Sequence, residues 1–144
     1  MANLEDIVKR GSERFNAGDV NGLLDLYTPD AELTSPGMNA KGREQIRGFT
    51  AAWLQGFPDA KITSKRYITV GSTVVEEGVF TGTHTGAFPT PMGDIPATGK
   101  RVEGPFVDIF DFEGDKVARD TLIFDRMLLM EQLGLMPTPA GSAA

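Results

Sequence analysis

Apolar positions in the first part of the chain follow the spacing of an amphipathic helix. Leu4, Ile7, Val8 and Phe15 recur at intervals of three and four residues, which predicts a helix of about three turns. Residues 16–19, Asn-Ala-Gly-Asp, are a turn signal that ends this helix. The pattern therefore places one face of the first helix against the core.

Two more helices are predicted before residue 60. Asp19 can cap a short helix that ends at residues 28–30, Thr-Pro-Asp, and a third helix begins at Gly42 and ends at Pro58. A short strand over residues 31–35 separates them. The first two helices should form a hairpin.

The second part of the chain has the composition of a sheet. Residues 61–70, 73–85 and 100–125 are rich in β-branched and aromatic side chains. Gly114 and Asp115 fit a two-residue hairpin loop that divides the last stretch into two strands. Helices followed by strands predict an α+β domain, with helices on one face of a mainly antiparallel sheet.

The C-terminal part is predicted to be a short helix and a tail. Residues 127–133 form the helix, Gly134 suits its C-cap, and residues 137–144 form a flexible tail. One domain is therefore expected over residues 1–136.

Composition narrows the class of protein. Hydrophobic residues make up 40% of the 144 residues and charged residues 24%, the balance of a globular protein with a core. The net charge of −6 argues against nucleic-acid binding. Cysteine is absent, which excludes disulfides and thiolate chemistry, and no targeting or membrane-spanning stretch is recognisable. We expect a cytoplasmic protein.

Regular pairing of the last hairpin predicts which side chains share a face. One predicted face combines aromatic side chains with ionisable ones: Phe106, Asp108, Phe110, Phe112, Val117, Arg119, Thr121, Ile123 and Asp125. The other predicted face holds Val107, Ile109, Leu122 and Phe124, interrupted by Asp111 and Asp120. A shift of one residue would exchange the two faces.

Two aspartates are candidate acid/base groups. A carboxyl group among aromatic side chains is costly to ionise, so the pKa of Asp108 or Asp125 should rise toward neutral pH. Each also has a structural interpretation, because Asp108 can pair with Arg119 and Asp125 can cap the last helix. Both interpretations stay open at this stage.

Other motifs give weaker signals. His84, the only histidine, is either a hydrogen-bond donor at the pocket rim or a structural group at a strand end, and it has no companions for a metal site. The stretch 82–99 is a long, partly apolar loop, either a lid or an arm packed on the sheet edge. It is not a dinucleotide fingerprint, and no serine-nucleophile motif occurs.

Several motifs together resemble the SnoaL-like polyketide cyclase group of the ketosteroid-isomerase-like superfamily. They lie at residues 16–19, 41–46, 57–59, 80–86, 96–100, 124–125 and 132–135. The resemblance covers nearly the whole chain and implies a cone-shaped α+β fold, in which a curved sheet wraps around N-terminal helices and encloses a pocket.

The resemblance also implies chemistry. It suggests a cofactor-free cyclase in which Asp125 is the acid/base group for an intramolecular aldol closure. Asp108 falls at the oxyanion-hole position of ketosteroid isomerases, whereas Ser35 and Gly11 stand at the positions of their base and tyrosine. Steroid isomerisation is therefore disfavoured. Asp108, Arg119 and Asp125 supply the residue types of the epoxide-hydrolase branch without its motif.

These observations define a functional hypothesis. Asp125 removes a proton next to a carbonyl of a small hydrophobic compound, and Arg119, His84 or protonated Asp108 stabilises the enolate. The expected substrate contacts are Arg119, Thr121, Phe106, Phe110, Trp53 and Phe15. The alternatives are a non-catalytic small-molecule binder, another reaction of the superfamily, and a partner-protein domain. We expect no cofactor or metal, and a homodimer formed through the exposed face of the sheet.

Overall fold

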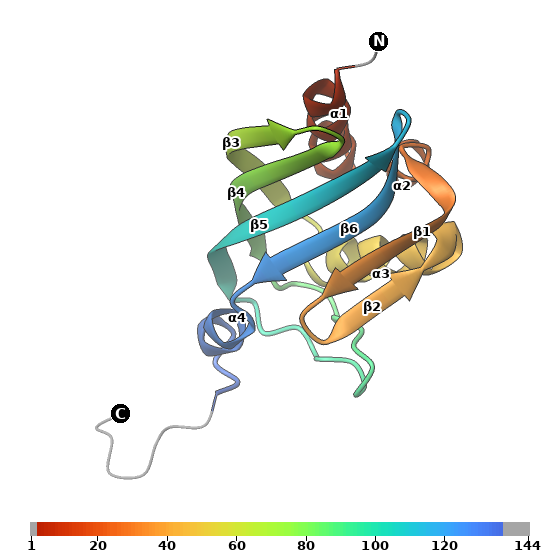
Figure 1. The fold of residues 1–144 in the computed structure, drawn as a ribbon. Helices are drawn as coiled ribbons and strands as arrows, with labels where there is room; N and C mark the ends of the chain where they lie inside the picture. The colour runs from red at the N-terminus through yellow and green to blue at the C-terminus, as the bar shows by residue number, and fades with distance from the viewer. Residues whose placement is uncertain (1–2, 137–144) are drawn as a thin grey trace.

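The computed structural model describes residues 3–136 (Figure 1). Its helices and strands are α1 (Leu4–Asn16), α2 (Val20–Leu24), β1 (Tyr27–Ser35), β2 (Met38–Lys41), α3 (Gly42–Gly56), β3 (Lys61–Val70), β4 (Thr73–Thr83), β5 (Arg101–Glu113), β6 (Lys116–Phe124) and α4 (Arg126–Gln132). The predicted α+β class and the curved, mainly antiparallel sheet are confirmed.

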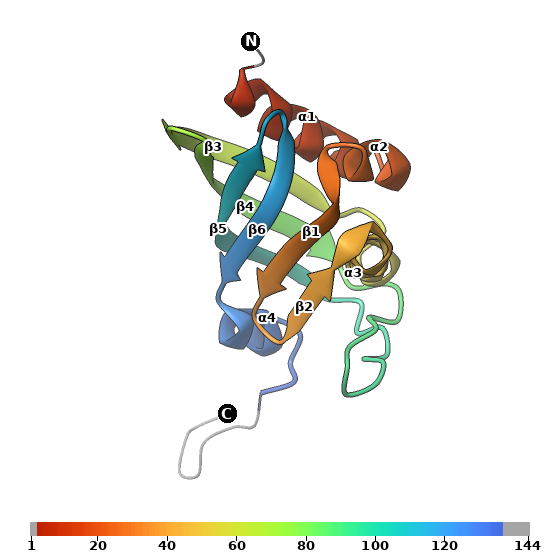
Figure 2. The same ribbon diagram turned by 45° about the vertical axis from the view of Figure 1, so that its right-hand side comes forward.

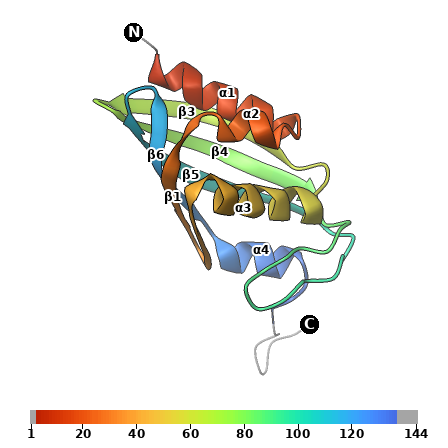
Figure 3. The ribbon, with the colours of Figure 1, turned by 90° about the vertical axis from the view of Figure 1, so that its right-hand side faces the viewer.

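One six-stranded sheet organises the described residues, in the order β2-β1-β6-β5-β4-β3 (Figure 1). Its neighbouring strands are antiparallel except β1 and β6, which are parallel. The helices α1, α3 and α4 follow one another along the concave side of the sheet (Figure 3). Figure 2 shows α3 beside the β1–β2 hairpin. The core therefore lies between one face of the sheet and the helices.

The sequence-based boundaries were wrong around β1. The second helix is shorter than predicted and ends at Leu24, and the strand predicted at residues 31–35 already begins at Tyr27. Strand β2 was not predicted. It pairs with β1 so that Ser35 lies opposite Met38. A short apolar stretch beside a proline gives no clear period, so tertiary pairing decides its conformation.

Polar caps begin the shorter helices where the sequence predicted them. Asp19 accepts a hydrogen bond from the Gly22 amide at 2.9 Å, and Asp125 accepts one from the Leu128 amide at 3.0 Å. Each bond satisfies an amide of the first helical turn that has no partner within the helix. These caps set the directions in which the chain enters α2 and α4.

Trp53 lies at the centre of an aromatic cluster. Its ring centroid is 5.9 Å from that of Phe57, 5.2 Å from Phe80, 4.8 Å from Phe88 and 5.5 Å from Phe124. These rings come from α3, the residue that follows it, β4, the loop after β4, and β6. Such stacked, edge-on and tilted contacts join the sheet, α3 and the loop.

The loop between β4 and β5 is a packed arm. Phe88 and Ile95 pair as an isolated bridge, and the Gly86 amide donates to the Gly56 carbonyl at 3.2 Å. Phe88 is buried against Trp53. The tail predicted at residues 137–144 lies outside the described residues. Within residues 3–136, no helix is long and apolar enough to cross a membrane.

Candidate functional site

A cavity of about 150 Å³ lies on the concave face of the sheet, beneath the helices. Most of its lining is apolar, and its polar side chains come from the strands β1, β4, β5 and β6, from the helices α1, α3 and α4, and from the residue before α4. Its lining includes Phe15, Phe49, Trp53, Phe80, Phe106, Phe110, Leu122, Phe124, Leu128 and Leu129, together with Tyr27, Glu76, Asp108, Asp120, Asp125 and Gln132. Apolar walls around a few converging polar groups are typical of a small-molecule site.

An irregularity in β6 decides which charged residues face this cavity. Val117 pairs with Phe112 as predicted, but Arg119 pairs with Asp111 and Asp120 with Phe110, so Ala118 is an extra residue in β6. This β-bulge shifts every later residue of β6 by one position. The predicted faces are therefore exchanged from residue 119 onward.

The predicted site positions of Arg119 and Thr121 were consequently wrong. Both lie on the outer face of the sheet and do not line the cavity, and Arg119 is exposed. The predicted ion pair between Asp108 and Arg119 does not form. Asp120 and Leu122, which were placed on the outer face, line the cavity instead.

Asp108, Asp120 and Tyr27 form a polar cluster at the cavity wall, in which Asp120 and Tyr27 are buried and Asp108 is half-buried with an inaccessible Oδ1. The Tyr27 hydroxyl donates to Asp120 Oδ2 at 2.6 Å, and Asp120 is only 3% exposed. Asp108 and Asp120 are close enough for a hydrogen bond when one of the two carboxyl groups holds a proton. No other donor in the described residues reaches Asp108 Oδ1 or Asp120 Oδ1.

The pKa values of the two aspartates are pushed apart. Burial raises the pKa of Asp108 well above its ordinary value, and the negative charges of Asp120 and Glu76 raise it further. Burial also raises the pKa of Asp120, but the hydrogen bonds from Asp108 and Tyr27 lower it. Asp108 is therefore the group that holds the shared proton, and Asp120 is the more easily ionised one.

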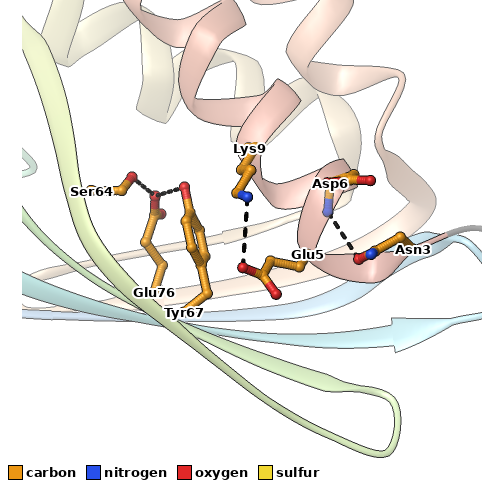
Figure 4. A network of polar contacts seen from close by, with 7 residues as sticks. All are labelled: Asn3, Glu5, Asp6, Lys9, Ser64, Tyr67 and Glu76. Atoms are coloured by element: carbon orange, nitrogen blue, oxygen red, sulfur yellow. Dashed lines mark hydrogen bonds and ion pairs between the residues drawn. The ribbon is translucent and has the colours of Figure 1, made fainter.

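Glu76 is a third buried carboxyl group at the same wall. It is 2% exposed, and its strand position is directly opposite Asp108. Its Oε2 accepts a hydrogen bond from Ser12 at 2.8 Å. The same oxygen accepts hydrogen bonds from Ser64 and, at 3.4 Å, from the Tyr67 hydroxyl (Figure 4). Burial raises the pKa of Glu76, whereas these three hydroxyl groups oppose the rise.

Asp125 caps α4 and also lines the cavity. Its bond to the Leu128 amide is the capping interaction that was one of its two interpretations. Asp125 is exposed to solvent, so the cavity reaches solvent at this end. The structural role is thus present, and the carboxyl group still borders the cavity.

His84 is buried but does not line the cavity. Its Nδ1 accepts a hydrogen bond from the Thr98 amide at 3.2 Å and is 2.9 Å from the Thr98 hydroxyl oxygen. Its ring lies 5.2 Å from that of Phe57, and burial lowers its pKa. His84 holds the ends of the loop between β4 and β5 together, and the structure does not bring it to Asp108.

Four of the predicted contact residues line the cavity: Phe15, Trp53, Phe106 and Phe110. Sequence reasoning missed Glu76, Asp120 and Tyr27. Glu76 could have been found, because it alternates with buried Val74 and with Phe80 on β4. Asp120 could not, because nothing at Ala118 identifies the bulge.

The described residues contain no group of three or more histidine, cysteine, aspartate or glutamate side chains arranged to hold a metal ion. The carboxyl groups of Glu76, Asp108 and Asp120 all line the apolar cavity.

The six-stranded curved sheet with its helices on one face is a ketosteroid-isomerase-like fold. The SnoaL-like polyketide cyclase family matches residues 5–133, and the chain belongs to this family. A search of curated proteins found no match.

Solved structures with the same fold are numerous. A candidate SnoaL-like polyketide cyclase from Jannaschia species CCS1 has a TM-score of 0.81 at 22% identity, covering 93% of both chains. IdmH from Streptomyces antibioticus, a candidate polyketide cyclase, has a TM-score of 0.76 at 26% identity, covering 92% of this chain and 99% of its own. A protein of ketosteroid-isomerase-like fold from Catenulispora acidiphila, in complex with trimethylamine, has a TM-score of 0.75 at 23% identity, covering 92% and 97%.

Proposed function

We propose that this protein is a cofactor-independent enzyme that removes a proton next to a carbonyl group of a small, mostly apolar compound. The observation that carries the proposal is the pair Asp108 and Asp120, two carboxyl groups in one apolar cavity whose environments push their pKa values apart. Such a pair supplies an acid and a base near neutral pH.

The geometry suggests a role for each group. Ionised Asp120, held by the Tyr27 hydroxyl, takes the proton from the carbon next to the carbonyl. Protonated Asp108 turns its O–H to the carbonyl oxygen and stabilises the enolate that forms. The electron pair of the broken C–H bond becomes the enolate, and the proton stays on Asp120.

An aldol closure completes the proposed reaction. The enolate carbon attacks a second carbonyl of the same molecule and forms a C–C bond, and the new alkoxide takes a proton from Asp120. Protons and electrons balance without an oxidant or a reductant. The base in this scheme is Asp120 rather than Asp125, because Asp125 is exposed and its carboxylate is engaged with α4. Arg119 and His84 take no part, since neither lines the cavity.

A non-catalytic binding protein is the second candidate. The observation that favours it is the predominance of apolar lining, which needs no chemistry to retain a hydrophobic molecule. In that case the buried carboxyl groups form a structural network, and their loss reduces stability without any effect on turnover.

The first prediction separates the two candidates through proton exchange. The wild-type protein should accelerate exchange of the protons next to the carbonyl of cyclohexanone with deuterium from D₂O, followed by NMR. Asp108→Asn and Asp120→Asn should each lower this rate by about a hundredfold or more, because each removes one partner of the proton transfer. The matched control is Asp111→Asn, which changes a carboxyl group on the outer face of β5.

Two results would overturn the proposed roles. If the wild-type protein binds cyclohexanone and does not accelerate exchange, the binding protein is the better account. If folded Asp108→Asn and Asp120→Asn both exchange at the wild-type rate, the acid/base group lies elsewhere.

We also propose that the protein is cytoplasmic and forms a homodimer through the outer face of the sheet. The lack of cysteine supports the first statement. The second is supported by apolar side chains on that face, among them Val75, Val107, Ile109 and Ile123. Nucleic acid remains an unfavourable partner for a chain with a net charge of −6.

A further inference from the structure

The charged side chains that line the cavity are all carboxyl groups. Its lining includes four carboxyl side chains, and none of the described residues that line it is a lysine, arginine or histidine. No lysine, arginine or histidine within residues 3–136 forms an ion pair with Glu76, Asp108 or Asp120. Buried carboxyl groups are normally paired, so these lack the counter-charge that burial usually requires.

Lys9 is a cation close to this region, and it is engaged elsewhere. Its Nζ lies 3.7 Å from Glu5 Oε1 and 5.3 Å from the centre of the Tyr67 ring (Figure 4). Tyr67 in turn donates its hydroxyl to Glu76. The ring of Tyr67 therefore connects the Lys9–Glu5 pair with Glu76, but no ion pair joins Lys9 to Glu76.

Buried polar atoms at the cavity also lack partners. Asp108 Oδ1 and Asp120 Oδ1 have no donor, and the Trp53 Nε1–H has no acceptor, among the described residues. Trp53 is 8% exposed and lines the cavity. These unpartnered atoms leave hydrogen-bonding capacity at residues that line the cavity, which a molecule with both a donor and an acceptor could satisfy.

Glu76 is held more firmly than the other two carboxyl groups. The three hydroxyl groups of Ser12, Ser64 and Tyr67 all donate to one oxygen, Oε2, from α1 and β3. None of the hydrogen bonds that Glu76 accepts within residues 3–136 goes to its other oxygen, Oε1. These bonds fix the carboxylate plane and favour its ionised form.

We propose that the substrate carries a positively charged nitrogen, an organic ammonium group, in addition to its carbonyl, and that Glu76 binds this group. The inference rests on the proposed function, because it assigns the same cavity to the substrate. Glu76 is directly opposite Asp108 across β4 and β5, so directly paired side chains begin about 5 Å apart. An ammonium group on Glu76 brings a neighbouring carbonyl within reach of Asp108.

The walls fit the remainder of such a molecule. Apolar cavities of about 150 Å³ are large enough for a single benzene ring. Aromatic faces also attract cations, and Phe15, Phe80 and Phe106 contribute rings to the lining. Carboxylate or phosphate compounds find no positive charge here and are repelled by the carboxyl groups. The substrate class is therefore a small amine with an apolar ring or chain and a carbonyl group.

The second prediction tests charge recognition with three compounds of one shape. We expect isothermal titration calorimetry at neutral pH to show that wild-type protein binds benzylamine about tenfold more tightly than benzyl alcohol, because a charge-assisted hydrogen bond replaces a neutral one. Benzoate should not bind. If benzyl alcohol or benzoate binds as tightly as benzylamine, the inference is wrong.

A matched pair of variants assigns the preference to one residue. Glu76→Gln should lower the ratio of benzylamine to benzyl alcohol affinity to near one, whereas Glu77→Gln, on the outer face of the same strand, should leave it unchanged. If Glu76 had only a structural role, Glu76→Gln would alter stability and leave the affinity ratio at its wild-type value. That result would contradict the proposal. If Glu76→Gln does not fold, the wild-type series alone decides.

Failure of this inference and failure of the proposed function give different results. Proton exchange of neutral cyclohexanone without any preference for benzylamine would retain the enzyme and reject the ammonium substrate. A clear preference for benzylamine, lost in Glu76→Gln, would establish the charged subsite even if no exchange occurs.

Discussion

At the scale of single residues, the raised pKa of Asp108 suits the proposed acid/base chemistry but makes the protein less stable as the pH rises. Its native pKa lies well above the ordinary value of 3.8, chiefly because the carboxyl group is buried. The native state therefore binds this proton more tightly than the unfolded state does. The resulting stabilisation is complete below about pH 3.8 and is lost as the pH rises through the native pKa.

The third prediction follows from this loss of stability at higher pH. Asp108→Asn keeps a hydrogen-bond donor for Asp120 but cannot ionise, so it escapes the loss of stability at higher pH. Urea unfolding between pH 4 and pH 8 should show the variant gaining stability steadily relative to wild type as the pH rises. The same comparison with Asp111→Asn serves as control. A stability difference that is constant across this range would show that Asp108 ionises normally.

Which site residues the sequence reveals depends on their neighbours. Asp108 could be predicted as a cavity residue because Phe106 and Phe110 flank it at a period of two. Tyr27 could not, because its apolar neighbours were equally compatible with a helix. The place of His84 could not be predicted either, because a single histidine in a loop carries no information about whether it faces the cavity.

At the scale of elements, the bulge at Ala118 sets the character of the site. With regular pairing, Arg119 would face the cavity opposite Phe110, and the carboxyl group of Asp108 would have a cationic partner. The extra residue places Asp120 there instead. One inserted residue thus replaces the predicted pair of Asp108 and Arg119 with a pair of carboxyl groups, Asp108 and Asp120. The strand was therefore predicted correctly while the site residues on it were not.

The short helix α4 depends on its cap. Seven residues are too few for a stable isolated helix, and Leu128, Leu129 and Gln132 from α4 line the cavity. The hydrogen bond from the Leu128 amide to Asp125 therefore stabilises one wall of the site.

The fourth prediction separates the cap from the charge of Asp125. Asp125→Ala should lower the free energy of unfolding by about 1 kcal/mol and speed hydrogen exchange at the Leu128 amide, whereas Asp125→Asn retains the cap and should be nearly neutral. With Asp120 as the base, Asp125→Asn should also retain proton exchange of cyclohexanone. A folded Asp125→Asn protein without that activity would return the role of base to Asp125.

At the scale of the whole molecule, the two faces of the sheet have different environments. The concave face is covered by helices and holds the cavity, whereas the outer face is not covered by any described element (Figures 1 and 3). The order of helices and strands along the chain was enough to predict this layered arrangement. The pairing of β1 with β6 was not predictable, because a parallel pair between distant segments leaves no local signal.

Cross-strand rows organise the outer face. One row is apolar over three strands, Ile68, Val75 and Ile109, and the next includes Val107 and Ile123. Ile68 is 46% exposed and Ile123 52%. Charged side chains flank these rows, including the pair of Arg66 and Glu77 at 2.6 Å, and Asp111 next to Arg119. An apolar centre with charges of both signs at its rim can match a second copy of itself about a two-fold axis.

The fifth prediction is therefore that the protein is a homodimer, and that a mutation on the outer face can dissociate its subunits without damage to the cavity. Light scattering coupled to size-exclusion chromatography should give twice the chain mass for wild type at micromolar concentration, because pairing of two outer faces would remove their apolar rows from water. Ile123→Lys should give a monomer, since it places a charge in the apolar centre. Met92→Lys, a control in the exposed loop between β4 and β5, should remain dimeric. A monomeric wild type would refute the interface. If Ile123→Lys is monomeric and still binds benzylamine, then each chain contains a complete site, as expected from a cavity on the opposite face.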